Sequence, residues 1–460
     1  MLRANFPRSV SGHRGAAGEI CSEQIIALAG FLLTLAAFWP GYLSWDSAYQ
    51  WWQARGAPLD PAHPPVMVHL WRAVRAVLPD PGGMLAVQAA VWWAAIALFA
   101  NALGGGAWRR AGTVALLGAW PPLLALLPHL WKDVGMAALF ALAVACLAHE
   151  VHAPPATARR WRVAALVALA LGCAFRLNAL SAALPLLGWI AWREVAPAPR
   201  RGARAWRVAL ATVALLIGTI LVSLGVNRAP GKDVPVWPAI ALWDLAAVSI
   251  EEERLLFPPV WVDPALTVAD LRRDFVPYVN VPSFEHGQLK LNFYFDYTPA
   301  QFDELRDAWL ALPFEHPRAY WTHRARLSAY LFGLRQGEHP DGLVISPGIV
   351  AFADNPPLAP NDGALHRVVQ PALSRLVDTP VFAAWPYLVA SLALVIAALG
   401  WRGGPAWREL AGAVAASGLC LAAPLAVLSP SSDFRYLLWS VFAALLAAAL
   451  WFAPRRPAPF

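Results

Sequence analysis

The sequence predicts an all-α polytopic membrane bundle of about ten transmembrane helices, with a small extracytoplasmic domain that is either mixed α/β or mostly helical. Of the 460 residues, 58% are hydrophobic and only 14% are charged, a balance typical of proteins that cross a membrane several times. The apolar residues gather in runs long enough to span about 30 Å of hydrocarbon. Two long polar segments interrupt these runs. Together the three observations favour a membrane protein over a soluble enzyme.

Ten apolar runs are candidates for membrane-spanning helices. They lie near residues 24–40, 84–103, 111–128, 134–149, 162–175, 177–192, 206–225, 381–401, 408–429 and 435–453. The fifth and sixth runs are separated by a single residue, so they also fit one kinked helix. In that case every later loop would change sides of the membrane.

Arginine is concentrated in every second loop between these runs. These arginines are Arg3, Arg8, Arg14, Arg109, Arg110, Arg159, Arg160, Arg162, Arg193, Arg200, Arg201, Arg204, Arg207, Arg402, Arg408, Arg455 and Arg456. Because cytoplasmic loops carry an excess of Lys and Arg, we expect both termini in the cytoplasm. The Arg- and Ala-rich composition is typical of a high-GC bacterium, and the expected location is the inner (plasma) membrane. The same loops explain the net charge of +7 without a nucleic-acid partner.

On this topology the chain divides into three parts. Residues 1–225 form an N-terminal transmembrane module, whose first outer loop, 41–83, contains candidate catalytic residues. Residues 226–378 form the extracytoplasmic domain, which is long enough to fold as a small unit. Residues 379–460 form the C-terminal transmembrane helices.

Local patterns predict the secondary structure of the two outer segments. Thr298-Pro299-Ala300-Gln301 is a capping-box pattern with proline at the first helical position. The predicted outer helices are 46–55, 66–78, 298–311 and 317–334. Runs rich in β-branched and aromatic residues predict strands at 289–295 and 343–352.

Five short polar clusters interrupt the apolar chain, and the topology assigns all five to the outer side. They are Trp45-Asp46-Ser47, His63-Pro64-Pro65, Lys132-Asp133, Arg176-Leu177-Asn178 and Asp433-Phe434-Arg435. Ionisable groups close to membrane-spanning segments are costly and usually have a function. A protein that only spans lipid has no need to gather them at one depth, whereas an enzyme acting on a lipid-linked substrate does.

The first outer loop contains two candidate catalytic residues. Asp46 lies just beyond the first run, where its carboxylate is suited to take the proton of an attacking hydroxyl as a general base. The alternative is a helix N-cap, for which aspartate is preferred. His63 is held by Pro64 and Pro65, which fix the backbone around it. A rigid turn with a solvated imidazole explains the same pattern.

Two further clusters are suited to a phosphate. Lys132 and Arg176 supply the fixed positive charge that a phosphate leaving group needs, and Asn178 is a further candidate for substrate binding. Asp133 is a candidate catalytic residue that orients the acceptor or the basic groups. Alternatively, Lys132 snorkels toward headgroups and Asp133 caps the following helix.

Arg435 and Trp45 complete the candidate site as substrate-binding residues. Arg435 is a second candidate phosphate ligand, although a structural salt bridge with Asp433 fits the pattern equally well. Trp45 is suited to stack on a sugar, with membership of an interfacial aromatic belt as the alternative. The cysteines form no metal-thiolate pattern, so no metal ligand or cofactor is predicted, and a requirement for a divalent metal stays open.

These residues resemble the GT-C superfamily of integral-membrane glycosyltransferases. The similarity is to the bacterial branch with protein O-mannosyltransferases and Rgt-type lipopolysaccharide and lipid A sugar transferases. It covers about residues 24–225, with interfacial helices in the first outer loop and an acidic residue, here Asp46, after the first span. The resemblance implies a polyprenyl-phosphate sugar donor, an acidic base, and basic residues on the lipid phosphate. Many relatives carry a second acidic residue where this chain has Ser47, so no paired-carboxylate role is carried over.

The expected function is an inverting membrane glycosyltransferase that moves a hexosyl or pentosyl group from a polyprenyl-phosphate donor to an extracytoplasmic glycan, lipid or protein acceptor. No Walker A or Gly-x-Gly-x-x-Gly motif opens a helix after a strand, which agrees with a lipid-linked rather than a nucleotide donor. Two alternatives are a transporter or flippase of lipid-linked saccharides, and a non-catalytic membrane assembly protein whose outer domain binds a partner.

Overall fold

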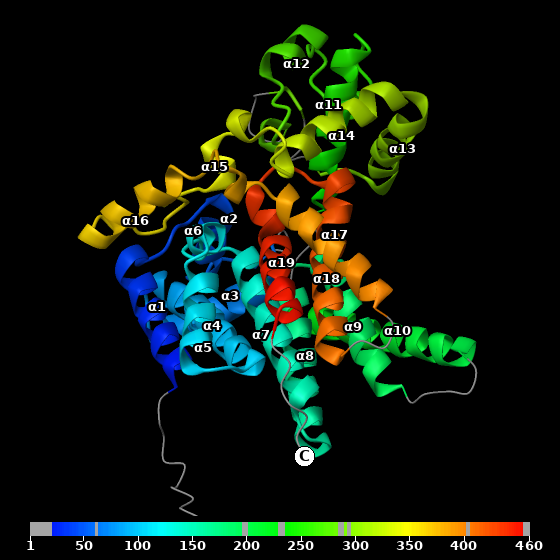
Figure 1. The fold of residues 1–460 in the computed structure, drawn as a ribbon. Coiled ribbons are helices and arrows are strands. Elements are labelled where there is room, and N and C mark those ends of the chain that lie inside the picture. The colour runs from blue at the N-terminus through cyan, green and yellow to red at the C-terminus, as the bar shows by residue number, and fades with distance from the viewer. Residues whose placement is uncertain are drawn as a thin grey trace, which may run out of the picture.

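The computed structural model describes residues 21–59, 63–195, 201–228, 235–283, 289–291, 296–401 and 405–453. Within these ranges the regular structure is helical, and extended pairing is limited to isolated bridges. Figure 1 shows helices α11–α14 gathered at one end of the molecule, with the apolar helices α4, α7 and α19 beneath them.

The helices follow one another along the whole described chain. They are α1 (Ser22–Phe38), α2 (Trp45–Ala54), α3 (Pro65–Arg75), α4 (Gly82–Leu103), α5 (Ala107–Gly118), α6 (Pro121–Leu126), α7 (Lys132–His152), α8 (Pro155–Phe175), α9 (Ala179–Glu194), α10 (Arg201–Val226), α11 (Trp237–Glu251), α12 (Val268–Asp274), α13 (Pro299–Glu315), α14 (Pro317–Leu331), α15 (Asp341–Val344), α16 (Ala364–Ser374), α17 (Trp385–Gly400), α18 (Ala406–Leu428) and α19 (Leu438–Trp451). Short 3-10 turns are η1 (Pro259–Trp261), η2 (Val281–Ser283), η3 (Gln336–Glu338), η4 (Pro380–Phe382) and η5 (Phe434–Leu437).

Five helical segments among the described residues are long and apolar enough to cross a membrane. They are Gly82–Leu103, Lys132–His152, Gly202–Val226, Ala406–Leu428 and Phe434–Trp451. The shorter apolar helices α1 and α17 accompany them. This supports a helical membrane protein, while the number of ten spans and the side assigned to each loop stay predictions.

Helix breaks decide the structure of three of the predicted runs. The run 111–128 is not one helix, because α5 ends at Gly118 and α6 begins at Pro121. Trp120 is extended, as expected before a proline that restricts its predecessor and lacks an N–H. The runs 162–175 and 177–192 are two helices, α8 and α9, separated by extended backbone at Arg176.

Aromatic rings fill the centre of the bundle. Trp92 on α4 stacks on Phe442 of α19, with ring centroids 4.7 Å apart, and Phe140 on α7 meets Trp439 edge-on at 5.2 Å. On α8, a Cβ at Gly172 would lie 2.6 Å from the Phe140 ring. Small residues allow membrane helices to approach closely, so Gly172 permits the tight packing of α7 on α8.

Of the two options predicted for the 226–378 segment, mixed α/β or mostly helical, its described residues fit the mostly helical one. Helices α2, α3, α13 and α14 confirm the four predicted outer helices, and Thr298 forms the predicted capping box at α13, accepting a hydrogen bond from Gln301 N at 3.4 Å. The strand predicted at 343–352 is wrong. Its first residues belong to α15, and only Ile349 forms an isolated bridge, to Leu43. With no longer partner strand beside it, the β-branched run cannot build a sheet.

Some predictions fall on residues outside the described ranges. Of the strand predicted at 289–295, residues 292–295 lie outside them, and Leu291 forms an isolated bridge with Val262. Arginines used for the topology that lie outside the described residues are Arg3, Arg8, Arg14, Arg200, Arg402, Arg455 and Arg456.

Candidate functional site

The five polar clusters come from five separate places in the chain and meet at one end of the bundle. Asp46 is in the first turn of α2, His63 precedes α3, and Lys132 opens α7. Arg176 lies between α8 and α9, and Arg435 lies in η5, just before α19. The contacts described below join these residues into one group, which we call the charged cluster: Asp46, His63, Lys132, Asp133, Arg176, Asn178, Asp433 and Arg435.

Asp46 is held by a cation rather than by its own helix. The N-cap of α2 is Ser44, so the capping role considered for Asp46 is wrong. Its carboxylate pairs with Arg435 Nη2 at 3.0 Å, and its side chain is 30% exposed. Burial alone would raise the pKa of Asp46, but the positive charges of Arg435 and Lys132 hold that pKa well below its usual range. The carboxylate is therefore ionised at neutral pH and reachable from solvent.

Lys132 and His63 form a directed pair. Lys132 Nζ lies 2.9 Å from His63 Nδ1, so the lysine does not snorkel away from the cluster. An ammonium group can only donate, and Nδ1 is therefore the unprotonated ring nitrogen. The ring proton is on Nε2, which faces Asp46 Oδ1 at 3.9 Å. Burial and the Lys132 charge lower the pKa of His63 to about 3, which leaves the imidazole neutral.

Arg435 connects two of the three carboxylates of the cluster. Its Nε lies 2.8 Å from Asp433 Oδ2, which confirms the ion pair considered for these residues, and its other end reaches Asp46. The guanidinium lies 4.7 Å from the centroid of the Trp131 ring, an arrangement in which a ring face attracts a cation. Arg435 is thus positioned by three neighbours and touches Asp46 directly.

Arg176 is oriented by groups on both sides. It forms an ion pair with Asp133, whose side chain is 1% exposed, and its Nε donates to Asn178 Oδ1 at 3.0 Å. Since Asp133 is not the N-cap of α7, its carboxylate serves to hold Arg176 and is too buried to touch an acceptor. Arg176 also lies 4.9 Å from the Tyr436 ring centroid, next to Arg435.

Trp45 lies at the rim. Its side chain is exposed, and its ring meets Phe352 edge-on at 6.0 Å. Phe352 also contacts Tyr49 at 5.3 Å, and Tyr49 contacts the His63 ring at 5.7 Å. The segment around Phe352 belongs to the 226–378 region, so this region covers the first outer loop beside the charged cluster.

Sequence reasoning missed the aromatic residues that support the cations. Trp131 directly precedes Lys132, and Tyr436 directly follows Arg435. This adjacency to two candidate site residues is the sequence signal that could have identified both rings. Phe352 had no such signal, because its contact with α2 depends on how the outer region folds back.

The 226–378 region, called the outer region below, also holds the segment that carries Arg435. Arg324 Nη1 donates to Ser429 O at 2.8 Å, and His339 Nε2 lies 2.8 Å from Ser432 O. Ser432 N donates to Tyr278 O at 2.8 Å. Three parts of the outer region thus hold the backbone of 429–432, immediately before Asp433.

Among the described residues, no group of three or more His, Cys, Asp or Glu side chains converges in a way that could hold a metal ion. Comparison of this chain with protein-family models, curated proteins and solved structures found no match. The chemistry must therefore be argued from the charged cluster itself.

The shifted histidine pKa values predict how stability depends on pH. Burial lowers the pKa of both His63 and His129 from 6.5 to about 3. As the pH falls through this window, the unfolded chain takes up protons that the folded chain does not. Each histidine therefore removes about 1.4 kcal/mol of stability per pH unit. We expect His63→Gln to make the fall in melting temperature between pH 6 and pH 4, measured in detergent, less steep than in the wild type.

Exposed His69 provides the control, because His69→Gln should keep the wild-type slope. An unchanged slope in His63→Gln would show that this imidazole is not buried in its neutral form.

Proposed function

We propose that this protein is an inverting membrane glycosyltransferase that uses a polyprenyl-phosphate sugar on the extracytoplasmic face of a bacterial inner membrane. The observation that carries the proposal is the charged cluster, in which the reachable carboxylate of Asp46 lies among Arg435, Lys132 and Arg176 at the end of apolar helices. This set pairs a base with the positive charge that a departing phosphate requires. The resemblance of the sequence to GT-C glycosyltransferases favours the same class.

The three cations are suited to the lipid phosphate. Lys132 begins the candidate span α7 and Arg176 pairs with Asp133 in its first turn, so both are suited to meet the charged head of a polyprenyl phosphate. Guanidinium groups bind phosphate oxygens in a bidentate way, and an ammonium adds a point charge. Neutralising the charge that develops on the phosphate is expected to be the largest electrostatic contribution to the rate.

Asp46 is suited to take the acceptor proton once the donor is bound. In the free protein its ion pair with Arg435 makes it a weak base, whereas a catalytic base works best when its pKa is near the operating pH. A donor phosphate would compete for Arg435 and so raise the pKa of Asp46. Asp46 then removes the proton as the acceptor oxygen bonds to the anomeric carbon, while the carbon–oxygen bond to the phosphate breaks from the opposite side.

The remaining residues have supporting roles in this scheme. Asp133 and Asn178 orient Arg176. His63 lies between Lys132 and Asp46, with Nδ1 toward the lysine and Nε2 toward the carboxylate. Trp45 and Phe352 lie beside the charged cluster, where aromatic rings can stack on a sugar. The 226–378 region, which contributes Phe352, is suited to select the acceptor.

The test is glycosyl transfer by the purified protein in liposomes, with radiolabelled polyprenyl-phosphate sugars and envelope-extract acceptors. Transfer of label to an acceptor supports the proposal. Movement of labelled lipid across the bilayer without transfer would indicate the flippase instead. If neither is seen and variants of Lys132 and Arg176 keep the protein's cellular role, the assembly protein is favoured.

Removing the guanidinium of Arg176 should weaken donor binding and should also lower turnover, because the negative charge on the phosphate grows as it leaves. A hydrogen bond to a charged group contributes about 1.5–3 kcal/mol, so we expect Arg176→Gln to raise the KM for the donor on the order of 10- to 100-fold. Arg228, an exposed cation beyond the end of α10, is the matched control, and Arg228→Gln should keep the wild-type KM. Equal KM values in both variants would exclude Arg176 as a phosphate ligand.

A further inference from the structure

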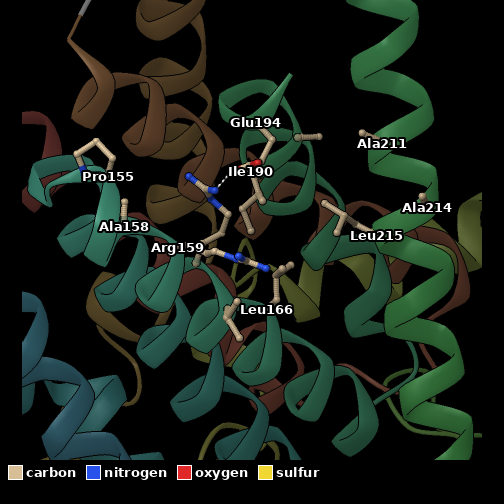
Figure 2. Close-up of a pocket in the computed structure, with 12 residues that line it drawn as sticks. Pro155, Ala158, Arg159, Leu166, Ile190, Glu194, Ala211, Ala214 and Leu215 are labelled. Atoms are coloured by element: carbon tan, nitrogen blue, oxygen red, sulfur yellow. Dashed lines mark ion pairs between the residues drawn. The ribbon is translucent and has the colours of Figure 1, made fainter. Parts of the chain in front are cut away.

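A large cavity lies at the opposite end of α8 from the charged cluster. It has a volume of about 680 Å³ and is bordered by α8, α9 and α10, as Figure 2 shows. This volume lies within the roughly 300–1,000 Å³ typical of ligand sites. Arg159, which lines the cavity, is 17 positions before Arg176 on the chain. At 1.5 Å per residue this separates the two by about 26 Å, so the cavity is not part of the proposed active site.

The walls of the cavity are mostly apolar. Leu166 and Ile190 come from α8 and α9, and Ala211, Ala214 and Leu215 come from α10. Helix α10 is the least buried of the candidate spans, with 11% of its apolar window inside the protein. A hollow between apolar helices in the hydrocarbon layer favours an acyl chain, because water there would find few hydrogen-bond partners.

The charged groups are all at one end of the cavity. Arg162 is already engaged, since it pairs with Glu194 and its Nη2 lies 2.7 Å from Glu150 Oε1. Arg159 lies three residues before Arg162 on α8, and both arginines line the cavity. Arg159 is exposed, and no ion pair is recorded for it in the described part of the chain. One guanidinium is therefore available at the mouth of an apolar cavity.

We propose that this cavity binds one anionic phospholipid, with its phosphate on Arg159 and an acyl chain between α8, α9 and α10. Basic pockets between helices at the cytoplasmic side of a membrane favour anionic headgroups. The arginine distribution predicts that side for this end of α8. The bound lipid would join α10 to the rest of the bundle. The inference depends on the membrane placement of the helices and is independent of glycosyl transfer.

Native mass spectrometry of the full-length protein tests this, with phosphatidylglycerol and phosphatidylcholine offered in equal amounts. We expect phosphatidylglycerol to be retained preferentially, and Arg159→Gln to lower its retention about fivefold, the contribution of one arginine near an anionic surface. Arg160→Gln is the matched control, because this neighbouring cation does not line the cavity and its loss should leave retention unchanged. Equal losses in both variants, or no preference in the wild type, would overturn the proposal.

A second variant tests whether an acyl chain occupies the space between α8, α9 and α10. Ala214 lines the cavity and is exposed on α10, so Ala214→Phe should fill the space, preserve the fold and reduce phosphatidylglycerol retention. Excess inorganic phosphate should not displace the lipid. Wild-type retention in Ala214→Phe, or complete displacement by phosphate, would show that the cavity does not hold a lipid chain. Melting temperatures confirm that each variant is folded.

Discussion

Asp46→Asn is expected to lower the rate of glycosyl transfer by about 10²- to 10⁴-fold, the usual contribution of a general base. In the wild type, Arg435 Nη2 lies 3.0 Å from Asp46 Oδ2. The amide of the variant keeps the shape of the carboxylate and can still accept a hydrogen bond from Arg435, but it cannot take the proton of the acceptor. The measurement is the initial rate in liposomes at saturating donor. Donor binding should not weaken, because the phosphate ligands remain in place and Asp46 no longer competes for Arg435.

The control is an aspartate on the same face that lies outside the charged cluster. Asp354 pairs with Arg55 at 3.5 Å and is 75% exposed, so Asp354→Asn should transfer at the wild-type rate. If Asp46→Asn also transfers at that rate, Asp46 is not the base.

The largest expected effect on stability comes from a buried ion cluster in the outer region. Asp244 on α11 has a fully buried side chain that pairs with Arg324 and with His323 Nε2 at 3.1 Å. It also accepts a hydrogen bond from Trp309 Nε1 at 2.7 Å. Asp244→Ala leaves Arg324 buried without its partner, and we expect the free energy of unfolding to fall by about 3–5 kcal/mol. Chemical or thermal unfolding in detergent measures this.

Transfer should fall in the same variant, because Arg324 also holds the backbone at Ser429, a few residues before Arg435. Asp303→Ala is the control, since Asp303 is 57% exposed and pairs with Arg306 on the surface, where ion pairs contribute little. The double variant Asp244→Leu with Arg324→Met should recover much of the lost stability by removing both charges. A melting temperature equal to that of the wild type in Asp244→Ala would mean that the cluster is not buried in the membrane-bound protein.

The local structure of the outer loops could be predicted where short-range chemistry decides it. The capping box at Thr298 depends only on residues within one helical turn, and α13 begins where this pattern predicts. The strand expected at 343–352 failed because a strand needs a partner, and β-branched composition alone does not supply one. In the same way, the predicted run 111–128 overlooked the break before Pro121, which depends on the backbone limits of that one residue pair.

The sequence could predict the residues of the candidate site but not the contacts between them. Its ionisable residues could be selected from the sequence because charge is costly beside apolar runs. Their partners could not. Asp46 and Asp133 each lie in the first turn of a helix, so capping explained them equally well until the ion pairs with Arg435 and Arg176 were seen. The tautomer of His63 likewise depends on the position of Lys132, which is distant in sequence.

By itself, the sequence predicted a helical membrane protein, its apolar helices and the ionisable residues that meet in the charged cluster. These follow from composition and from patterns of a few residues, which act through water, lipid and the local backbone. Only the tertiary structure decided that Asp46, Lys132, Arg176 and Arg435 meet, and that the outer region holds the segment before Arg435 in place. Such contacts join residues from separate helices, so they depend on how the helices pack and not on any local pattern.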